Sequence, residues 1–232
     1  MLPITSEMRK LFKGFNYSAE VIILSIYLKC RYSLSYRDIE EMGNIRGLET
    51  DHATLQRWVV RFMPVFEKNF RKRKKPINGS WRMDETYVKC NGKWVYLYRA
   101  VDKYGYTIDF LLRKKRDAQA AKCFLRKAMK QHGIPAKVNV DKSGANKAAL
   151  DAMNETCSQE IEVRQNKYLN NIVESDHRFI KKRIKLMLGF KSFRSAAKTL
   201  AGIELIHMIK KGQLIDGERY TSAFSQFASL VA

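Results

Sequence analysis

The segment from residue 167 to residue 185, KYLNNIVESDHRFIKKRIK, constrains the fold most strongly, because it predicts one amphipathic helix with two distinct faces. At 100° per residue, an acid and three cations fall within about 60° of one another along roughly 16 Å of helix axis. These residues are Glu174, Arg178, Lys181 and Lys185. The adjoining face carries Leu169, Val173, Ile180, Ile184 and Met187, at the spacing of a helix that packs on a core. The charged stripe is therefore expected to face outward, either as an ordinary solvated face or as part of a functional site.

Two aspartates upstream lie where a sheet could bring them close to Glu174. Residues 81–90 (WRMDETYVKC) and 93–102 (KWVYLYRAVD) are strand-like and joined by Asn-Gly, which predicts a hairpin with Asp84 inside its first strand. Residues 137–144 (KVNVDKSG) predict a short strand ending at Asp141, a position where open α/β sheets place functional groups. Clustered carboxylates force protonation unless cations neutralise them. The pattern therefore favours two Mg²⁺ ions, for which Mn²⁺ is a possible substitute.

These motifs resemble those of the insertion sequence 6 family of bacterial DDE transposases. The matching phrases are SYRDI and HATLQRW near the front, DETYVKCNGKWVYLYRAVD around Asp84, VNVDKSG around Asp141, and KYLNNIVESDHR around Glu174. They occur in the family's order and span about residues 14 to 210, which is nearly the whole chain. The surroundings of Asp141 differ from the family pattern, since Asn139 and Lys142 stand where Thr-Asp-Gln or Ser-Asp-Gly is more usual.

The resemblance implies an RNase H-like catalytic domain whose catalytic and metal-binding triad is Asp84, Asp141 and Glu174. It also implies an enzyme that nicks the inverted-repeat ends of its element and joins the freed 3′-OH to target DNA through replicative cointegrates. A basic residue seven positions after the glutamate, here Lys181, matches the family as well. Glu85 is adjacent to Asp84 but points to the opposite side of the strand, so we do not expect it to be a ligand.

Charge also indicates nucleic acid as the partner. The chain of 232 residues has 44 Lys and Arg against 23 Asp and Glu, a formal net charge of +21, which favours a polyanionic ligand, with an anionic membrane surface second. Its longest apolar run, VIILSIYL, is too short to span a bilayer, and no signal peptide is evident. The four cysteines form no CxxC motif, so neither a zinc site nor a disulfide framework is expected. We expect a bacterial cytoplasmic protein that associates with the nucleoid.

The order of predicted elements gives the fold class independently of the resemblance. Three strands are followed by alternating helices and strands, which predicts an α/β, RNase H-like domain with a mixed sheet flanked by helices. A small all-α domain with a helix-turn-helix pattern precedes it. The expected divisions are a lead-in at 1–15, the helix-turn-helix domain at 16–66, a basic linker at 67–79, the catalytic domain at 80–211 and a tail at 212–232.

We expect three groups of residues to contact double-stranded DNA. The third front-end helix, at 51–63, is predicted to read bases, unless the domain serves only packing or dimerisation. The basic run is predicted to track phosphates, and the cations after Glu174 to grip DNA beside the metals. The residues are His52, Thr54, Gln56, Arg57, Arg71, Lys72, Arg73, Lys74, Lys75, Arg178, Lys181 and Lys185.

Two rival functions are consistent with parts of this pattern. A metal-dependent, structure-selective nuclease would use the same triad without strand transfer, but it would not need a helix-turn-helix module. A DNA-binding regulator that has lost catalysis would not need an intact triad. A transposase that pairs two element ends must also act as at least a homodimer.

Overall fold

The computed structural model describes residues 6–142 and 144–231. The chain forms two compact units, one over Pro76–Ile184 and the other built from residues up to Lys75 together with those from Lys185 onward. The first of these contains the sheet, and the second is helical. The chain therefore leaves the helical unit, builds the sheet-containing unit, and returns.

The sheet of the 76–184 unit has five strands in the order β3-β2-β1-β4-β5. The first three form an antiparallel meander, whereas β4 pairs in parallel with β1 and β5 in parallel with β4. This order and these directions confirm the expected RNase H-like class. The elements are β1 (Ser80–Cys90), β2 (Lys93–Asp102), β3 (Thr107–Arg113), α5 (Ala118–His132), β4 (Lys137–Val140), α6 (Gly144–Asn154), β5 (Glu162–Gln165) and α7 (Lys167–Leu186).

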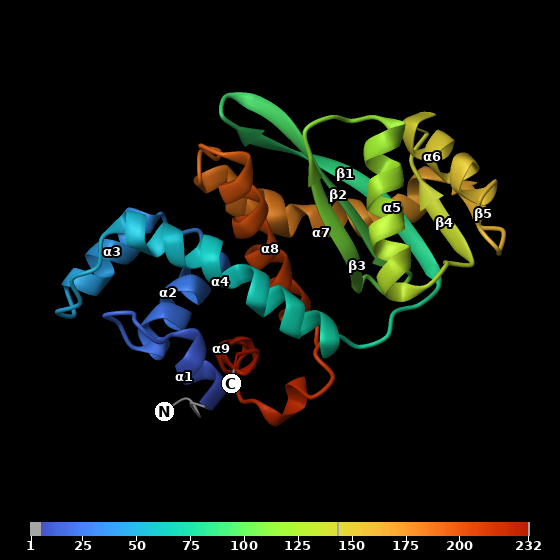
Figure 1. Ribbon diagram of the computed structural model, residues 1–232. Helices are drawn as coiled ribbons and strands as arrows, with labels where there is room; N and C mark the ends of the chain where they lie inside the picture. The colour runs from blue at the N-terminus through green and yellow to red at the C-terminus, as the bar shows by residue number, and fades with distance from the viewer. Residues whose placement is uncertain (1–5, 143, 232) are drawn as a thin grey trace. The chain divides into compact units, whose positions relative to one another are not determined.

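One face of the sheet forms the main core with α5 and α6 (Figure 1). Alternate residues of β1, such as Trp81 and Met83, point into this core because side chains alternate between the faces of a strand. Phe124 of α5 and Leu150 of α6 fill it from the helix side and are fully buried. The hairpin turn at Asn91 and Gly92 has positive φ at both residues, as the Asn-Gly pair predicted.

The other face of the sheet is covered by α7, which crosses behind the strands in Figure 1. Its buried side chains are Asn170, Val173, His177 and Ile180, so the stripe mixes the expected apolar residues with two polar ones. Asn170, and Asp176 next to His177, have partners on the sheet. Asn139 of β4 donates through Nδ2 to Oδ1 of Asn170 at 2.6 Å, and the fully buried Arg99 of β2 pairs with Asp176 at 2.6 Å.

The helical unit has a core made by three long helices. These are α2 (Ala19–Arg31), α4 (His52–Lys72) and α8 (Phe193–Lys210). The shorter elements are α1 (Ser6–Leu11), α3 (Tyr36–Asn44), the 3₁₀ turn η1 (Gly217–Arg219) and α9 (Ala223–Ala228). Side-chain caps at Ser18, Ser35 and Asp51 begin α2, α3 and α4.

Helix α4 is longer than the sequence suggested, because Pro64 does not end it. Pro64 has no N–H to donate to the carbonyl of Val60, which costs the helix one bond. The helix continues because Phe62, Phe66 and Phe70 keep the spacing of a buried face and are almost fully buried. Phe66 also stacks on Phe227 of α9, with ring centroids 4.3 Å apart.

The basic run at residues 71–75 differs from the expected linker. Arg71 and Lys72 belong to α4, and Arg73 makes a two-atom contact with Asp216, at 2.8 Å to each carboxylate oxygen. Lys75 donates its backbone N–H to the carbonyl of Gln213. The run packs because an acid and a backbone carbonyl of the C-terminal segment, Asp216 and Gln213, bind it. The local sequence around the run does not reveal that this segment is its partner.

Both chain ends also differ from the expected boundaries. Helix α8 was expected to close the catalytic domain, but it packs against α2 and α4 in the helical unit. The tail contributes buried residues such as Leu214 and Phe227, and Phe12 of the lead-in lies 4.7 Å from Phe62 between ring centroids. Residues 1–5 of the lead-in lie outside the described residues. Long-range packing rather than sequence proximity decides which unit each segment joins.

Among the residues that the structure describes, no helix combines the length and apolar character needed to cross a membrane.

Helix α8 approaches both α2 and α4 closely at Gly202. A Cβ atom there would lie 2.3 Å from Sγ of Cys30 and 2.6 Å from Cε of Met63. Gly202 therefore allows α8 to approach both α2 and α4.

We predict that Gly202→Ala lowers the free energy of unfolding by about 1–3 kcal/mol, because overpacking outweighs the helix-propensity gain of about 1 kcal/mol that alanine brings elsewhere. Urea unfolding followed by circular dichroism measures this. Gly144→Ala in α6 is the matched control, since a Cβ there meets no atom within 4 Å and should be neutral or stabilising. Equal effects of the two substitutions would contradict the packing argument.

Candidate active site

Asp84 and Glu85 of β1 point to opposite faces of the sheet, as the strand alternation predicted. Asp84 faces α7, where its Oδ2 lies 3.5 Å from Nδ1 of His177. Glu85 faces α6, where it accepts a hydrogen bond of 3.0 Å from Asn146. It also contacts the guanidinium of Arg116. Glu85 is thus occupied by partners on the core side.

Asp141 lies just beyond the end of β4, beside Asp84. The parallel register pairs Arg82 with Asn139, and continuing it by two residues brings Asp141 level with Asp84. The Asp141 side chain is 38% exposed, and its Oδ2 lies 3.7 Å from Nη2 of Arg116. Two aspartates from neighbouring strands therefore lie at one edge of the sheet.

Glu174 completes the acidic group from α7 and is exposed. The electrostatic effect of the group falls on Asp84, whose side chain is only 17% exposed. Burial first, then the charges of Glu85, Asp141 and Glu174, raise the pKa of Asp84 to about 7. The three predicted carboxylates are thus close enough for the ionised form of one to be destabilised by the other two.

The chemistry of this group fits a divalent cation of the Mg²⁺ type, which prefers carboxylate oxygens. Burial first, and then the neighbouring negative charges, raise the pKa of Asp84, and such an ion would favour its ionised form. In the described part of the chain, however, no three Asp, Glu, His or Cys side chains lie close enough to hold an ion as they stand. The carboxylates would have to close around the ion.

His177 is a neighbour of the triad that sequence reasoning missed. It is 2% exposed and lies one helical turn after Glu174. Burial, followed by the positive charges of Arg99 and Lys181, lowers the pKa of His177 to about 3. Its contact with Asp84 is therefore between a neutral imidazole and a carboxyl group and is not an ion pair. The signal was present in the motif ESDHR, where a histidine follows the glutamate at i+3.

Arg116 and Asn139 are two further residues that the sequence did not single out for a role at the site. Arg116, in the loop before α5, bridges Glu85 and Asp141 with its guanidinium. Asn139, which departs from the family pattern, holds the start of α7 by contacts with Asn170 and with both the carbonyl and the N–H of Asn166. Neither has a local sequence signature, because both act between segments that are distant in the chain.

Four further acids of this unit have structural partners. Asp102 accepts two backbone N–H bonds in the β2–β3 turn and a third from Asn78 before β1, and Asp117 caps α5. Asp109 binds Lys127, and Asp176 binds Arg99.

The predicted base-reading residues lie at the start of α4, but several already have partners within the helical unit. His52 contacts Glu40 of α3 at 3.0 Å, and Gln56 donates to Oγ of Ser195 on α8 at 3.2 Å. Thr54 and Arg57 form a local network with Asp51, although the Arg57 side chain is 74% exposed. Trp58 packs in the core of the helical unit.

The predicted phosphate-contacting cations fall into two classes. In the run at 71–75, Arg71 pairs with Glu67, and Arg73 and Lys75 pair with Asp216 and Glu218. In contrast, Arg178, Lys181 and Lys185 of α7 are exposed on the same stripe as Glu174. The α7 stripe is therefore better placed than the run at 71–75 to meet a polyanion.

Comparison with solved structures finds distant similarity to retroviral integrases. The catalytic core domain of BIV integrase is 18% identical, with a TM-score of 0.42, and the match covers 62% of this chain and 93% of that one. The HTLV-2 integrase catalytic core domain in complex with magnesium is also 18% identical, with a TM-score of 0.41, over 56% of this chain and 85% of that one.

Comparison by sequence gives much higher similarity to curated bacterial proteins. The transposase for insertion sequence-like element IS431mec of Staphylococcus aureus is 40% identical over 201 residues, which is 86% of this chain and 88% of the relative. The transposase for insertion sequence element IS257 in transposon Tn4003, also from Staphylococcus aureus, matches to the same extent. A family model described as a DDE domain matches residues 78–213, more than half of the chain. The chain therefore belongs to the DDE transposases of the IS431 and IS257 type, within the insertion sequence 6 family.

Proposed function

We propose that this transposase binds the inverted-repeat ends of its own insertion sequence, nicks them to free 3′-OH ends, and transfers those ends to target DNA, with replicative cointegrates as the product. The observation that carries the proposal is the electrostatic coupling of Asp84 to Asp141 and Glu174 across β1, the end of β4 and α7. The reaction takes place on the DNA of the bacterial cytoplasm.

The two chemical steps balance without a nucleotide cofactor. Nicking adds water across one phosphodiester, breaks its P–O3′ bond, and leaves a 3′-OH and a 5′-phosphate. Joining exchanges one phosphodiester for another, since the 3′-OH attacks the target phosphorus and the target 3′-oxygen leaves with a proton. Both steps require a deprotonated attacking oxygen and a stabilised leaving oxygen.

The three carboxylates are proposed to hold the divalent ions that meet this requirement. Two Mg²⁺ ions, or Mn²⁺ in their place, activate the attacking oxygen and absorb charge on the leaving oxygen when bound. Asp84, the most buried of the three, would hold these ions together with Asp141 and Glu174. His177 fixes the position of Asp84, and Arg99 with Asp176 fixes that of α7.

DNA recognition is assigned to the helical unit and to the exposed stripe of α7. The start of α4 is proposed as the base reader, with Arg57 as its most exposed cation. The α7 cations would hold phosphates beside the scissile bond. Because two ends must be joined to one target, the active complex contains at least two copies of the chain.

Incubation of the full chain with DNA carrying the element's inverted repeats, with and without Mg²⁺, distinguishes the proposal from its rivals. Strand-transfer products that depend on Mg²⁺ support it. Cleavage without joining would indicate a nuclease, and repeat binding without cleavage would indicate a regulator.

We predict that Asp84→Asn, Asp141→Asn and Glu174→Gln each reduce cleavage and joining at least a thousandfold and change binding to the ends less than threefold. Each substitution removes a proposed metal ligand but no proposed DNA contact. Gel assays for nicked and joined products, with binding measured in parallel, test this. Activity within tenfold of the unaltered protein would remove that residue from the triad.

We predict that Lys181→Ala lowers joining at least tenfold and lowers the salt dependence of end binding by about one log unit per log unit of salt. Lys181 is close enough to His177 to lower its pKa, so its ammonium is near the triad. Mg²⁺ dependence should not change. Lys182→Ala is the control, because Lys182 is exposed but turned by about 100° on the helix. If the two variants behave alike, the proposed DNA-facing side of α7 is incorrect.

We predict that Asp84→Asn stabilises the metal-free protein at pH 7.5. The folded-state pKa of Asp84, about 7, lies above its unfolded value. The folded state therefore binds the proton more tightly, and the carboxyl increasingly destabilises the fold as pH rises from about 4 to 7. Removing it should raise the free energy of unfolding by on the order of 1–4 kcal/mol at pH 7.5 and by little at pH 4.

Calorimetry in the presence of a chelator measures this difference. The half-exposed Asp141 provides a control, since Asp141→Asn should change stability much less. If Asp84→Asn instead lowers the free energy of unfolding at pH 7.5, the folded protein stabilises the ionised Asp84 carboxylate without a cation.

A further inference from the structure

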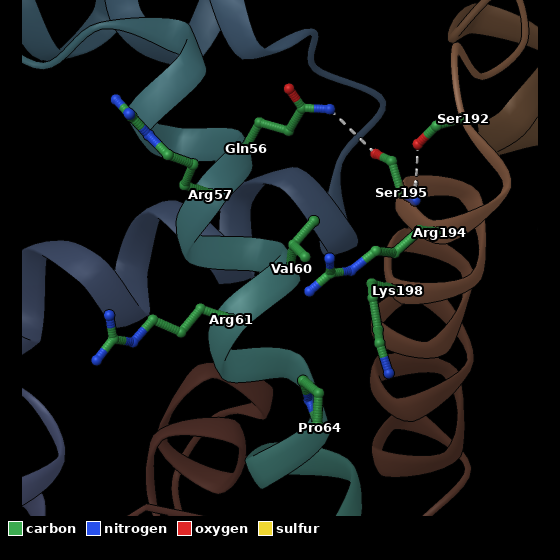
Figure 2. Close-up of a pocket in the computed structure, with 9 residues that line it drawn as sticks. All are labelled: Gln56, Arg57, Val60, Arg61, Pro64, Ser192, Arg194, Ser195 and Lys198. Carbon is green, nitrogen blue, oxygen red and sulfur yellow. Dashed lines mark hydrogen bonds between the residues drawn. The ribbon is translucent and has the colours of Figure 1, made fainter.

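A groove of about 800 Å³ lies between α4 and α8, entirely within the helical unit (Figure 2). Both of its walls come from long helices, one before the catalytic domain in sequence and one after it. The lining residues are Gln56, Arg57, Val60, Arg61, Pro64, Ser192, Arg194, Ser195 and Lys198.

The walls of this groove are held at a fixed separation. Gly202 allows α8 to pack closely on α2 and α4 one turn beyond Lys198. At the other end, Gln56 donates a hydrogen bond across the groove to Ser195. Ser192 caps α8 by accepting the N–H of Ser195 at 3.1 Å. The groove is therefore part of the fold and does not depend on a surface loop.

The groove is strongly cationic. Its lining includes Arg57 and Arg61 on α4 and Arg194 and Lys198 on α8, but no acid. In Figure 2, Arg194 reaches from α8 toward α4, while Arg57 and Arg61 stand on the outer side of α4. A row of cations thus crosses both helices.

Arg194 and Lys198 of α8 differ from the cations of the run at 71–75, since the part of the chain that the structure describes offers them no acidic partner. Arg73 and Lys75 are paired with Asp216 and Glu218. Within the described residues, the structure gives Arg194 and Lys198 neither an ion pair nor a hydrogen bond. Unpaired cations on a rigid, acid-free surface attract phosphate, and arginine can bind it through two N–H groups at once.

We propose that the α4–α8 groove binds the phosphodiester backbone of the duplex at the element end, next to the bases read by the start of α4. This inference rests on the proposed function, because it names a second contact surface for the same DNA. Its consequence is that the DNA-binding surface is assembled from both sides of the catalytic domain in sequence. A fragment restricted to residues 1–75 would lack half of it.

The experiment uses full-length protein with the double substitution Arg194→Ala/Lys198→Ala. Affinity is measured from 50 to 300 mM salt on two duplexes of equal length, one carrying the inverted repeat and one of random sequence. We expect the dissociation constant at 100 mM salt to rise at least tenfold on both duplexes. The slope of log affinity against log salt should fall by about 2, since each lost phosphate contact removes about 0.9. The preference for the repeat should be unchanged, because phosphate contacts carry no sequence information.

Two further variants separate groove chemistry from bulk charge and from misfolding. Lys13→Ala/Arg219→Ala removes the same charge from exposed positions of the helical unit that do not line the groove, and it should change affinity less than threefold. Arg194→Lys/Lys198→Arg keeps the charge and should restore most of the binding. Circular dichroism and thermal unfolding establish that each variant is folded.

An unchanged salt slope on both duplexes in folded Arg194→Ala/Lys198→Ala protein overturns the groove proposal. An effect equal to that of the Lys13/Arg219 control overturns it too. If the unaltered protein shows no preference for the repeat, the proposed recognition of the element ends is wrong. The salt slope measured on random DNA still tests whether the groove binds phosphates.

Discussion

The docking of α7 on the sheet through buried polar contacts is the constraint on which the active site depends. Arg99 is fully buried and its partner Asp176 is 10% exposed, so the pair is held in a low-dielectric setting. Breaking one partner of such a pair costs about 3–5 kcal/mol, because the other charge is left uncompensated. Asn139 and Asn170 hold the same helix at its start. These contacts place Glu174 within electrostatic reach of Asp84.

Without a bound metal ion, the ionised form of Asp84 is electrostatically unfavourable. Burial and three neighbouring carboxylates act against ionised Asp84, while a neutral His177 gives it no compensating charge. The guanidinium of Arg116 offsets part of the negative charge of Glu85 and Asp141. A site of this kind loses stability in the absence of cations and gains it on binding them, which links metal affinity to proton release.

The positive charges of the chain serve two different purposes. Some are structural, such as Arg73, whose contacts with Asp216 and the carbonyl of Ser229 hold the C-terminal segment in place. Others lie on defined surfaces, namely Arg178, Lys181 and Lys185 on α7, and Arg194 and Lys198 in the groove between α4 and α8. A net charge of +21 therefore predicts a polyanionic partner without indicating which cations meet it.

The sequence by itself determined the family and the class of the sheet-containing unit, and it predicted the triad. Alternation and turn signals locate the β1–β2 hairpin and β4, and the motifs around Asp84, Asp141 and Glu174 predict the chemistry, because both kinds of signal are local. Tertiary structure alone decided that α8 and the tail join the helical unit, that α4 continues through Pro64, and that the run at 71–75 is paired. It also decided the positions of His177, Arg116 and Arg194. Each of these outcomes depends on contacts between segments far apart in the chain, and, apart from the histidine of the ESDHR motif, such contacts leave no pattern in the residues on either side.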